Sequence, residues 1–239
     1  MSPVSESELV VDLPPRYREG WREQFDEIIR RQLRPGITVL DVGSGRNPTI
    51  LPADRPANVT YVGMDLSADE LRFAGQGAYD ERVVADLATR IPSLVNTADL
   101  AVSWQVLEHV KPLNVALDNV YAYLKPGGTF VAMLSGDRSV FGLVNRALPN
   151  AIGKRLVTRS MRRDETSPVF PAHYDRCHET ALQVMLSKWS EVEIRALFRG
   201  ANYFYFSTLL TRAYLGYENA VERAARKNFA THYLVVAKR

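Results

Sequence analysis

A glycine-containing turn directly after a short apolar run is the first feature of the sequence that could do chemistry. The run over 37–42 contains Asp41 and is followed by Gly43, Ser44 and Gly45. Glycines let the backbone turn sharply and approach a ligand that a side chain would exclude. A single G-x-G is weak by itself, so a plain tight turn and a ligand-binding loop stay equally open at this point.

Acidic residues at the ends of the next two apolar runs favour a ligand. Asp65 stands 20–22 residues beyond the glycines of the turn, where a carboxylate can accept hydrogen bonds from both hydroxyls of a ribose. The alternative is an acid at a helix N-terminus, because a helix is expected to begin near Ser67. Asp86 could accept a hydrogen bond from an exocyclic amino group, with Leu66 and Leu87 as apolar contacts for a flat ring.

Polar and aromatic residues follow the fourth apolar run. Trp104 and Gln105 stand where a second substrate would meet the nucleoside, and His109 comes shortly after them. An imidazole with an ordinary pKa of ~6.5 suits proton transfer near neutral pH. His109 is therefore the first candidate for a catalytic base and His173 the second, while a structural bond to a backbone carbonyl is the alternative for either histidine.

The elements that must position these residues alternate along the chain. Strands are predicted over 37–42, 59–65, 81–87, 98–104, 128–134, 190–198 and 232–238. Helices are predicted over 16–33, from 112 to a stop signal at 125–128, and over 178–189 and 207–227. Apolar strands separated by helices indicate a parallel sheet covered on both faces, with ligands outside the carboxyl ends of the strands.

The segment after the glycine turn departs from the dinucleotide-binding pattern. Pro48 stands where the fingerprint G-x-G-x-x-G has its third glycine, which disfavours a nicotinamide-dependent dehydrogenase. Asn47 is a candidate N-cap for a helix with Pro48 in its first turn. Prolines at 52 and 56 predict that this helix is short.

Five segments, taken in order, resemble the successive motifs of class I S-adenosylmethionine-dependent methyltransferases. They are VLDVGSGRNP, YVGMDLS, VVADLA, ADLAVSWQVLEHV and LKPGGTFVAML. The resemblance covers residues 37–134, and HYLVVAKR is similar to the last, antiparallel strand of the family. VLEHV and LKPGG most resemble the small-molecule subgroup, which includes quinone and natural-product methyltransferases. The NPPY-like motif of amino-directed DNA methyltransferases is absent, since SWQV follows the fourth run.

The resemblance implies that S-adenosylmethionine is the cofactor and S-adenosylhomocysteine the product. The cofactor-binding residues predicted in this way are Asp41, Gly43, Ser44, Gly45, Asp65, Leu66, Asp86, Leu87, Trp104 and Gln105. Asp41 and the two glycines would line the methionine end, Asp65 would hold the ribose, and Asp86 would bind the adenine amino group. Trp104 and Gln105 would lie beside the methionyl portion. Asn47 occupies a position that is often glycine in the family.

Charge is divided unevenly along the chain. The net charge is +3, but residues 1–153 carry −4 and residues 154–239 carry +7. Segment 138–163 has seven basic residues and no acidic one. It could be a lid with its basic side in water, a contact for an anionic membrane or lipid-linked substrate, or a contact for RNA phosphates. Nucleic acid is the least favoured partner, because the aromatic residues cluster elsewhere, at 203–206.

Length and composition fit one globular domain of 239 residues, 46% of them hydrophobic. No apolar run approaches the ~18 residues that cross a bilayer, and the N-terminus lacks the pattern of a signal peptide. The single cysteine, Cys177, excludes a disulfide framework and a multi-cysteine metal site. We therefore predict a cytoplasmic protein without a metal site, with peripheral membrane contact left open.

The predicted fold is a Rossmann-like α/β domain over 1–239, with a seven-stranded, mostly parallel sheet, an antiparallel last strand, helices on both faces and a late lid-like insertion. Its predicted parts are an N-terminal helical cap (1–36), a cofactor-binding core (37–134), a basic substrate-lid insertion (135–176) and closing helices and strands (177–239). The predicted function is methyl transfer, by in-line displacement, to oxygen of a small-molecule or lipid-like acceptor. A non-catalytic methyltransferase-like binding subunit, an RNA methyltransferase and a dehydrogenase are the alternatives, and the sequence does not determine the oligomeric state.

Overall fold

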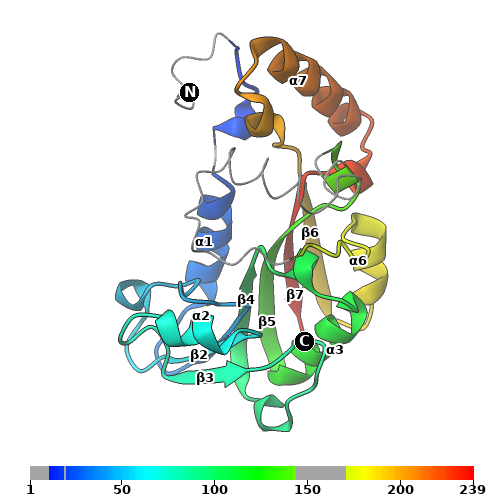
Figure 1. The fold of residues 1–239 in the computed structure, drawn as a ribbon. Helices are drawn as coiled ribbons and strands as arrows, with labels where there is room; N and C mark the ends of the chain where they lie inside the picture. The colour runs from blue at the N-terminus through cyan, green and yellow to red at the C-terminus, as the bar shows by residue number, and fades with distance from the viewer. Residues whose placement is uncertain (1–10, 19, 141, 144–170) are drawn as a thin grey trace.

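The computed structural model describes residues 11–18, 20–140, 142–143 and 171–239, and it contains a seven-stranded sheet (Figure 1). The strands are β1 (Thr38–Val42), β2 (Thr60–Asp65), β3 (Glu81–Val84), β4 (Ala98–Trp104), β5 (Leu124–Ser135), β6 (Glu191–Leu197) and β7 (His232–Lys238). Their order in the sheet is β3-β2-β1-β4-β5-β7-β6. The predicted seven-stranded sheet is confirmed.

Six strands run in one direction, and β7 runs against both of its neighbours, β5 and β6. The carboxyl ends of the six strands therefore lie with the start of β7 along one side of the sheet, which we call the carboxyl edge. At this edge His232 pairs with Ser135 of β5 and with Leu197 of β6. Segments that are distant in sequence consequently meet where ligands bind in such sheets.

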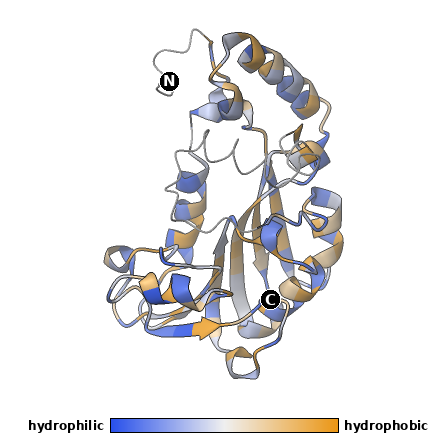
Figure 2. Cartoon of the chain, viewed as in Figure 1, coloured by the Kyte–Doolittle hydropathy of each residue, from blue (hydrophilic) through white to orange (hydrophobic). Residues whose placement is uncertain are grey.

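Helices cover both faces of the sheet, as predicted. One face carries α1 (Trp21–Gln32) and α2 (Ala68–Phe73), and the other carries α3 (Leu113–Tyr123) and α6 (Glu179–Met185). On α1, Phe25, Ile28 and Ile29 recur at helical spacing and are at most 8% exposed. Figure 2 shows hydrophobic residues along the strands and hydrophilic residues on the outer parts of α1 and α2. The core therefore consists of two apolar layers, one on each side of the sheet.

A smaller group of elements stands beyond the carboxyl edge, and we call it the cap cluster (Figure 1). It comprises the 3-10 turns η2 (Pro15–Tyr17) and η6 (Ala201–Phe204) and the helix α7 (Thr208–Arg223). Ala201, Tyr214 and Leu215 are its buried apolar centre. The predicted N-terminal helix is thus divided, because η2 belongs to the cap cluster while α1 packs on the sheet.

The predicted helix after the glycine turn is wrong. Residues 43–51 form a loop, and only a 3-10 turn, η3 (Pro52–Asp54), follows it before β2. Pro48 and the first residue of η3 are prolines without an N–H to donate, and the N–H of Thr49 donates to a side chain. Asn47 therefore has no helix to cap.

The predicted basic segment 138–163 and lid 135–176 lie mostly outside the described residues, since 144–170 are not among them. Their role stays a prediction. None of the described helices has the length and apolar character that crossing a bilayer requires.

Candidate active site

The loop after β1 takes a course that only glycine permits at Gly43. Its φ is 70°, and a Cβ there would lie 2.4 Å from both methyl carbons of Val106. The Gly43 N–H donates to the Met64 carbonyl at 2.7 Å. Gly45 has a φ of 55°, and its N–H donates to Oδ2 of Asp65 at 2.9 Å. The structure therefore brings the predicted loop against the end of β2 and against the turn after β4.

Asp41 lies beneath this loop and has no exposed surface. Its Oδ2 accepts hydrogen bonds from the Thr49 N–H and the Tyr61 hydroxyl, both at 2.7 Å, and its Oδ1 accepts one from the Thr49 hydroxyl at 2.6 Å. Burial raises the pKa of Asp41, and these donors oppose the rise. The carboxylate supports the loop through three of its about four acceptor sites, which leaves one site, on Oδ1, for the predicted contact with a ligand.

Asp65 is half-buried beside the loop. Its Oδ1 accepts the Ser67 N–H at 2.8 Å, and its Oδ2 accepts the Gly45 N–H at 2.9 Å. Burial raises the pKa of Asp65, and the two backbone N–H groups oppose that rise. Because a carboxylate has about four lone-pair sites, both oxygens can still accept a hydrogen bond from a ligand.

The end of β3 presents the third predicted acid at the surface. Asp86 is exposed, and its Oδ1 accepts the Ala88 N–H at 2.8 Å. Leu66 is 63% exposed, whereas Leu87 is 6% exposed and packs in the core on the side of α3. Leu66 and the Asp86 carboxylate are therefore accessible at the surface, whereas Leu87 is mainly a core residue.

Trp104 and Gln105 end β4 next to the glycine loop. The Trp104 ring meets the Phe25 ring edge-on at 4.9 Å between centroids, and the Arg22 guanidinium lies 4.8 Å from the Trp104 ring centroid. Gln105 has a φ of 55°, and its N–H donates to the Met133 carbonyl at 2.7 Å. Val106, which directly follows Trp104 and Gln105, contacts Gly43 of the glycine loop. The backbone of Trp104 and Gln105 therefore lies near the predicted residues of that loop.

Two groups that support the loop were not predicted. The Arg46 guanidinium donates to both oxygens of Glu70, at 2.8 and 2.5 Å, and these bonds lower the pKa of Glu70. The Tyr79 hydroxyl donates to the carbonyls of Gly45, at 3.0 Å, and of Ser44, at 3.2 Å. The Ser44 hydroxyl is buried and has no hydrogen-bond partner among the described residues. No motif marks these contacts, because they join residues 24 to 35 positions apart.

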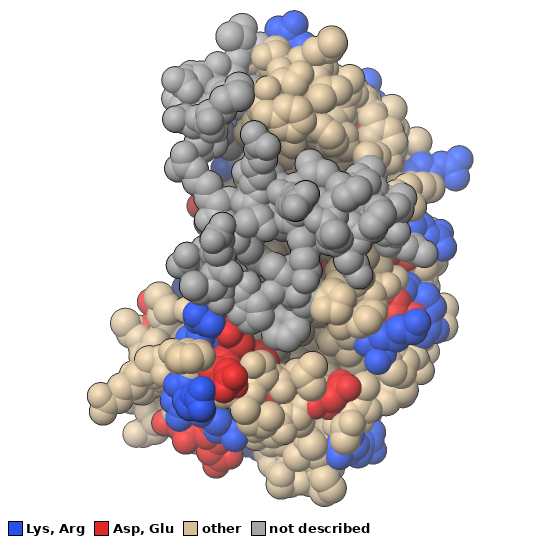
Figure 3. All heavy atoms as spheres, viewed as in Figure 1, with Lys and Arg blue, Asp and Glu red and all other residues tan. Residues whose placement is uncertain are grey.

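Charged side chains gather over α2 and the strand ends beside it, at the lower left of Figure 3. The ion pairs Arg46–Glu70 and Arg72–Asp69 belong to α2 and the loop that faces it. On the same view the region of α7 is largely uncharged. On this face, α2 and its surroundings are therefore more densely charged than α7.

The two predicted catalytic histidines lie in neighbouring segments. His109 ends the 3-10 turn η5 (Leu107–His109), and its Nδ1 lies 3.1 Å from the Pro171 carbonyl oxygen. Since a carbonyl oxygen only accepts, we assign the hydrogen to Nδ1, which leaves the lone pair of the neutral ring on Nε2. The exposed His173 is held by its N–H, which donates to the Glu108 carbonyl at 2.8 Å. The structure therefore brings both histidines to the backbone around Glu108.

Glu108 is a buried acid at this point that was not predicted as a site residue. It is 4% exposed, and its Oε1 accepts the Ser135 N–H at 3.3 Å and the Ser135 hydroxyl at 2.8 Å. Its Oε2 is buried and has no hydrogen-bond partner among the described residues. Burial raises the pKa of Glu108, and the neighbouring His109 opposes the rise. The only sequence signal for it was its place beside His109 in VLEHV.

A groove of about 460 Å³ lies elsewhere, between α6 and β6. Among the residues that line it are Gln183, Trp189 and Val192, together with Lys227, whose Nζ pairs with Glu179 at 3.2 Å. None of the predicted site residues lines this groove. The candidate site is therefore defined by the loops of the carboxyl edge.

The strand order, the antiparallel β7 and the glycine loop after β1 together define a Rossmann-like methyltransferase fold. A family model described as a methyltransferase domain matches residues 16–205. The chain therefore belongs to this methyltransferase family, of the class I, S-adenosylmethionine-dependent type.

Comparisons with individual proteins agree with the family. A ubiquinone biosynthesis O-methyltransferase of Paramagnetospirillum magneticum is 31% identical over 109 residues, which cover 44% of this chain and 43% of the relative. A demethylmenaquinone methyltransferase of Symbiobacterium thermophilum is 28% identical over 48% of each chain. The chain thus matches about half the length of these curated relatives. The structure of geranyl diphosphate C-methyltransferase from Streptomyces coelicolor, with S-adenosylhomocysteine, superposes with a TM-score of 0.58 at 17% identity, covering 99% of this chain and 85% of that one.

Proposed function

We propose that this chain transfers the methyl group of S-adenosylmethionine to a hydroxyl oxygen of a small-molecule or lipid-like acceptor. The observation that carries the proposal is the direct bond between the Gly45 N–H and Asp65 at the ends of β1 and β2. This bond joins a backbone loop open to a ligand with a carboxylate suited to a ribose. The quinone-methylating relatives support a small, flat acceptor.

The residues present fit the cofactor. Gly43 and Gly45 have no Cβ and adopt a positive φ, so the backbone there can turn tightly and come close to a ligand, and the buried Ser44 hydroxyl still lacks a partner among the described residues. Asp65 would hold the ribose hydroxyls, and the exposed Asp86 would take the adenine amino group. S-adenosylmethionine supplies a methyl group on a positively charged sulfur, which is a good leaving group.

The contribution of the chain to the reaction is to orient the acceptor and to remove its proton. Orientation of the reacting atoms can by itself supply several kcal/mol of the barrier. His109 has the free lone pair on Nε2, so it can accept the proton of an acceptor hydroxyl and leave the oxygen as the nucleophile. His173 is the second candidate for this role.

Isotope-labelled methyl transfer tests the proposal. The chain is incubated with S-adenosylmethionine labelled in the methyl group, first with a catechol as probe acceptor and then with a cell extract, and the products are analysed by mass spectrometry. We expect the label in a methoxy group. Label on carbon or nitrogen would contradict the oxygen assignment.

Calorimetry with S-adenosylhomocysteine and with NAD, run beside the transfer experiment, identifies the alternatives. Binding of S-adenosylhomocysteine without transfer into any compound of the extract would indicate a non-catalytic binding subunit. Binding of NAD in place of S-adenosylhomocysteine would indicate a dehydrogenase.

Contact of the basic segment with an anionic membrane is a separate proposal, tested by co-sedimentation with phosphatidylglycerol vesicles at low salt.

A further inference from the structure

The strand β6 forms one edge of the sheet, with α6 beside it (Figure 1). Within the part of the chain that the structure describes, β7 is the only strand that pairs with β6, so the outer side of β6 has no strand to bond. Such an edge is a template for a further strand. The opposite edge, β3, has four residues, against seven in β6. The edge at β6 is therefore the longer place for a second chain to pair.

The sequence of β6 has none of the features that usually protect an edge. Proteins block edge strands with proline, lysine, a bulge or a short strand. The sequence EVEIRAL contains no proline, glycine or lysine, and its register with β7 is unbroken from Glu191 to Leu197. None of its seven residues is buried. Among the described residues, β6 is therefore accessible to a partner strand.

One face of β6 is apolar and lines the groove between β6 and α6. Val192 lines this groove and is 41% exposed. Ile194 also lines it and packs on the core layer of α3 and α6, as does Ala196. Side chains alternate between the two faces of a strand, so these three residues share the α6 face. A partner strand beside β6 would shield the exposed Val192 from water.

The other face of β6 carries charges that are complementary to themselves. Glu193 and Arg195 stand on either side of Ile194, and Nε of Arg195 donates to Oε1 of Glu193 at 2.6 Å. Their side chains are accessible, at 56% and 42% exposure. If two copies pair antiparallel with Ile194 opposite itself, Glu193 of each copy lies opposite Arg195 of the other. Four charges of alternating sign then meet at the two-fold axis.

The other registers lose this complementarity. In a two-fold antiparallel pair, one residue must oppose its own copy. With Glu193 at that position two carboxylates meet, and with Arg195 there two guanidinium groups meet. Like charges directly opposite each other destabilise a strand pair. Ile194 is the middle residue of β6, so it is the only centre that pairs all seven residues, and it opposes no like charges.

We propose that two copies of this chain pair antiparallel through β6, with Ile194 opposite itself, and form one continuous sheet. The outer N–H and C=O groups of both strands then bond to each other. On the α6 face, Val192 of each copy lies opposite Ala196 of the other. The inference does not depend on methyl transfer, because none of the predicted site residues lies on β6.

Analytical ultracentrifugation of the full chain tests the pairing. We expect wild type to sediment as a dimer at tens of micromolar. Glu193→Arg and Arg195→Glu should each weaken association at least about tenfold, because each places two pairs of like charges opposite one another. The double variant with both reversals should dimerise again. Glu191→Arg is the matched control, since Glu191 opposes Leu197 of the second copy, and its association should stay within about twofold of wild type.

Mixing the two single variants separates lost pairing from lost folding. One variant then presents only arginine at positions 193 and 195 and the other only glutamate, so the mixture should form a heterodimer, which an unfolded chain would not. Circular dichroism checks each variant. A wild-type monomer at tens of micromolar would overturn the proposal. A dimer that both single reversals leave unchanged, or single variants that stay monomeric when mixed, would overturn it as well.

Discussion

We call the glycine loop with Asp41 and Asp65 the cofactor end of the carboxyl edge, and Glu108 with Ser135 and His232 the acceptor end, after the ligands proposed to bind there. The carboxylates of the two ends are paired to different degrees. At the cofactor end, all four carboxylate oxygens of Asp41 and Asp65 accept a hydrogen bond from a backbone N–H or a hydroxyl up to 20 positions away, while the Ser44 hydroxyl is buried without a partner among the described residues. At the acceptor end, Oε2 of Glu108 and Nδ1 of His232 are buried, and neither has a hydrogen-bond partner among the described residues.

This difference indicates two kinds of site. A buried polar group without a partner costs about 1–3 kcal/mol, whereas a paired group does not carry that cost. The carboxylates of the cofactor end are therefore held in place before any ligand arrives, whereas at the acceptor end one carboxylate oxygen, on Glu108, is left for a ligand to satisfy. The following predictions test this contrast, beginning with the largest expected effect.

The Gly43→Ala substitution should damage the cofactor end most. A Cβ would meet Val106 at 2.4 Å in a backbone conformation that alanine adopts poorly, so we expect a loss of roughly 4 kcal/mol in the free energy of unfolding. Urea unfolding followed by tryptophan fluorescence measures it. Gly75→Ala is the control, because a Cβ there meets no atom within 4 Å. Equal stabilities of the two variants would show that the loop is not preorganised in this way.

His232 should make the acceptor end sensitive to acid. Burial, with the charge of Arg199, lowers the pKa of His232 to about 3, and its ring lies 3.9 Å from that of Trp21. The unfolded chain binds a proton below a pKa of ~6.5, while the folded chain resists it until near 3, so stability is lost as the pH falls through this window.

Between pH 7 and pH 4 this single group should cost about 3 kcal/mol of folding free energy. Urea unfolding at both pH values should therefore show a smaller pH dependence in His232→Asn than in wild type. The same pH dependence in both proteins would mean that His232 is not buried in its neutral form.

The His109→Ala substitution should separate catalysis from cofactor binding. If Nε2 removes the acceptor proton, turnover should fall roughly 100-fold. The affinity for S-adenosylhomocysteine should stay within twofold of wild type. Initial rates of labelled methyl transfer, with calorimetry in parallel, give the two numbers. A turnover rate equal to that of wild type would remove His109 as the base.

The Arg46–Glu70 pair should have the smallest effect of the four. Glu70→Gln weakens a partly buried two-point bond, so we expect a loss of about 1 kcal/mol in unfolding free energy. Glu27→Gln, which removes an exposed pair with Arg31 on α1, is the matched control and should change stability by less than half as much. Thermal unfolding of both variants compares them, and a larger loss in Glu27→Gln would contradict the buried role of the pair.

The same contrast explains how much could be predicted from sequence. The positions of the strands along the chain are predictable from local apolar runs. The meeting of Gly43, Gly45 and Asp65 is also predictable, because each of these residues lies at or just after the end of a strand. The role of Asp41 as a ligand stays a prediction, and its bonds to Thr49 and Tyr61 are contacts that no spacing reveals.

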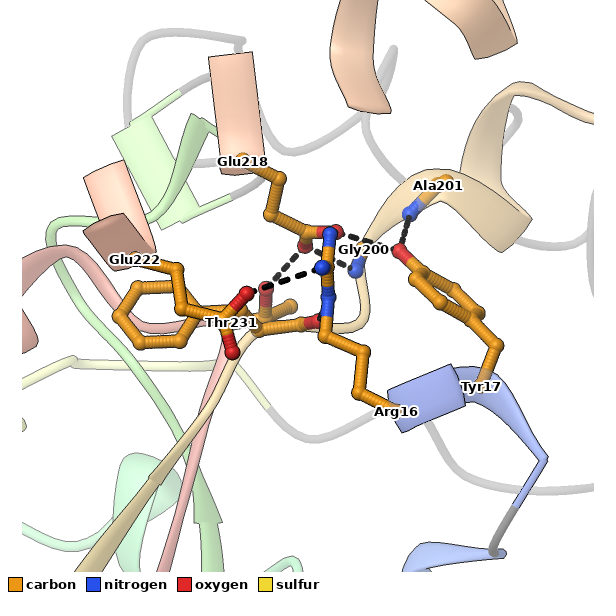
Figure 4. Close-up of polar contacts among 8 residues, drawn as sticks. Arg16, Tyr17, Gly200, Ala201, Glu218, Glu222 and Thr231 are labelled. Atoms are coloured by element: carbon orange, nitrogen blue, oxygen red, sulfur yellow. Dashed lines mark hydrogen bonds and ion pairs between the residues drawn. The ribbon is translucent and has the colours of Figure 1, made fainter. Parts of the chain in front are cut away.

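The contacts of the cap cluster were not predicted, because they join segments that are distant in the sequence (Figure 4). Glu218 joins residues near 16, 200 and 231, and its contacts become visible only when the sheet brings them together. The predicted helix after Asn47 was wrong for a related reason. The Thr49 N–H donates to the Asp41 side chain there, in place of a backbone carbonyl of a helix.

Calorimetric titration with S-adenosylhomocysteine tests the central claim most directly, in wild type, Asp65→Ala and the control Asp69→Ala. Asp69 is an exposed acid on α2 that pairs with Arg72 and does not contact the glycine loop. We predict micromolar affinity in wild type, affinity within twofold in Asp69→Ala, and at least about 100-fold weaker binding in Asp65→Ala, because hydrogen bonds to a charged acceptor contribute roughly 1.5–3 kcal/mol each. Unchanged affinity in Asp65→Ala would contradict the assignment of this site to the cofactor.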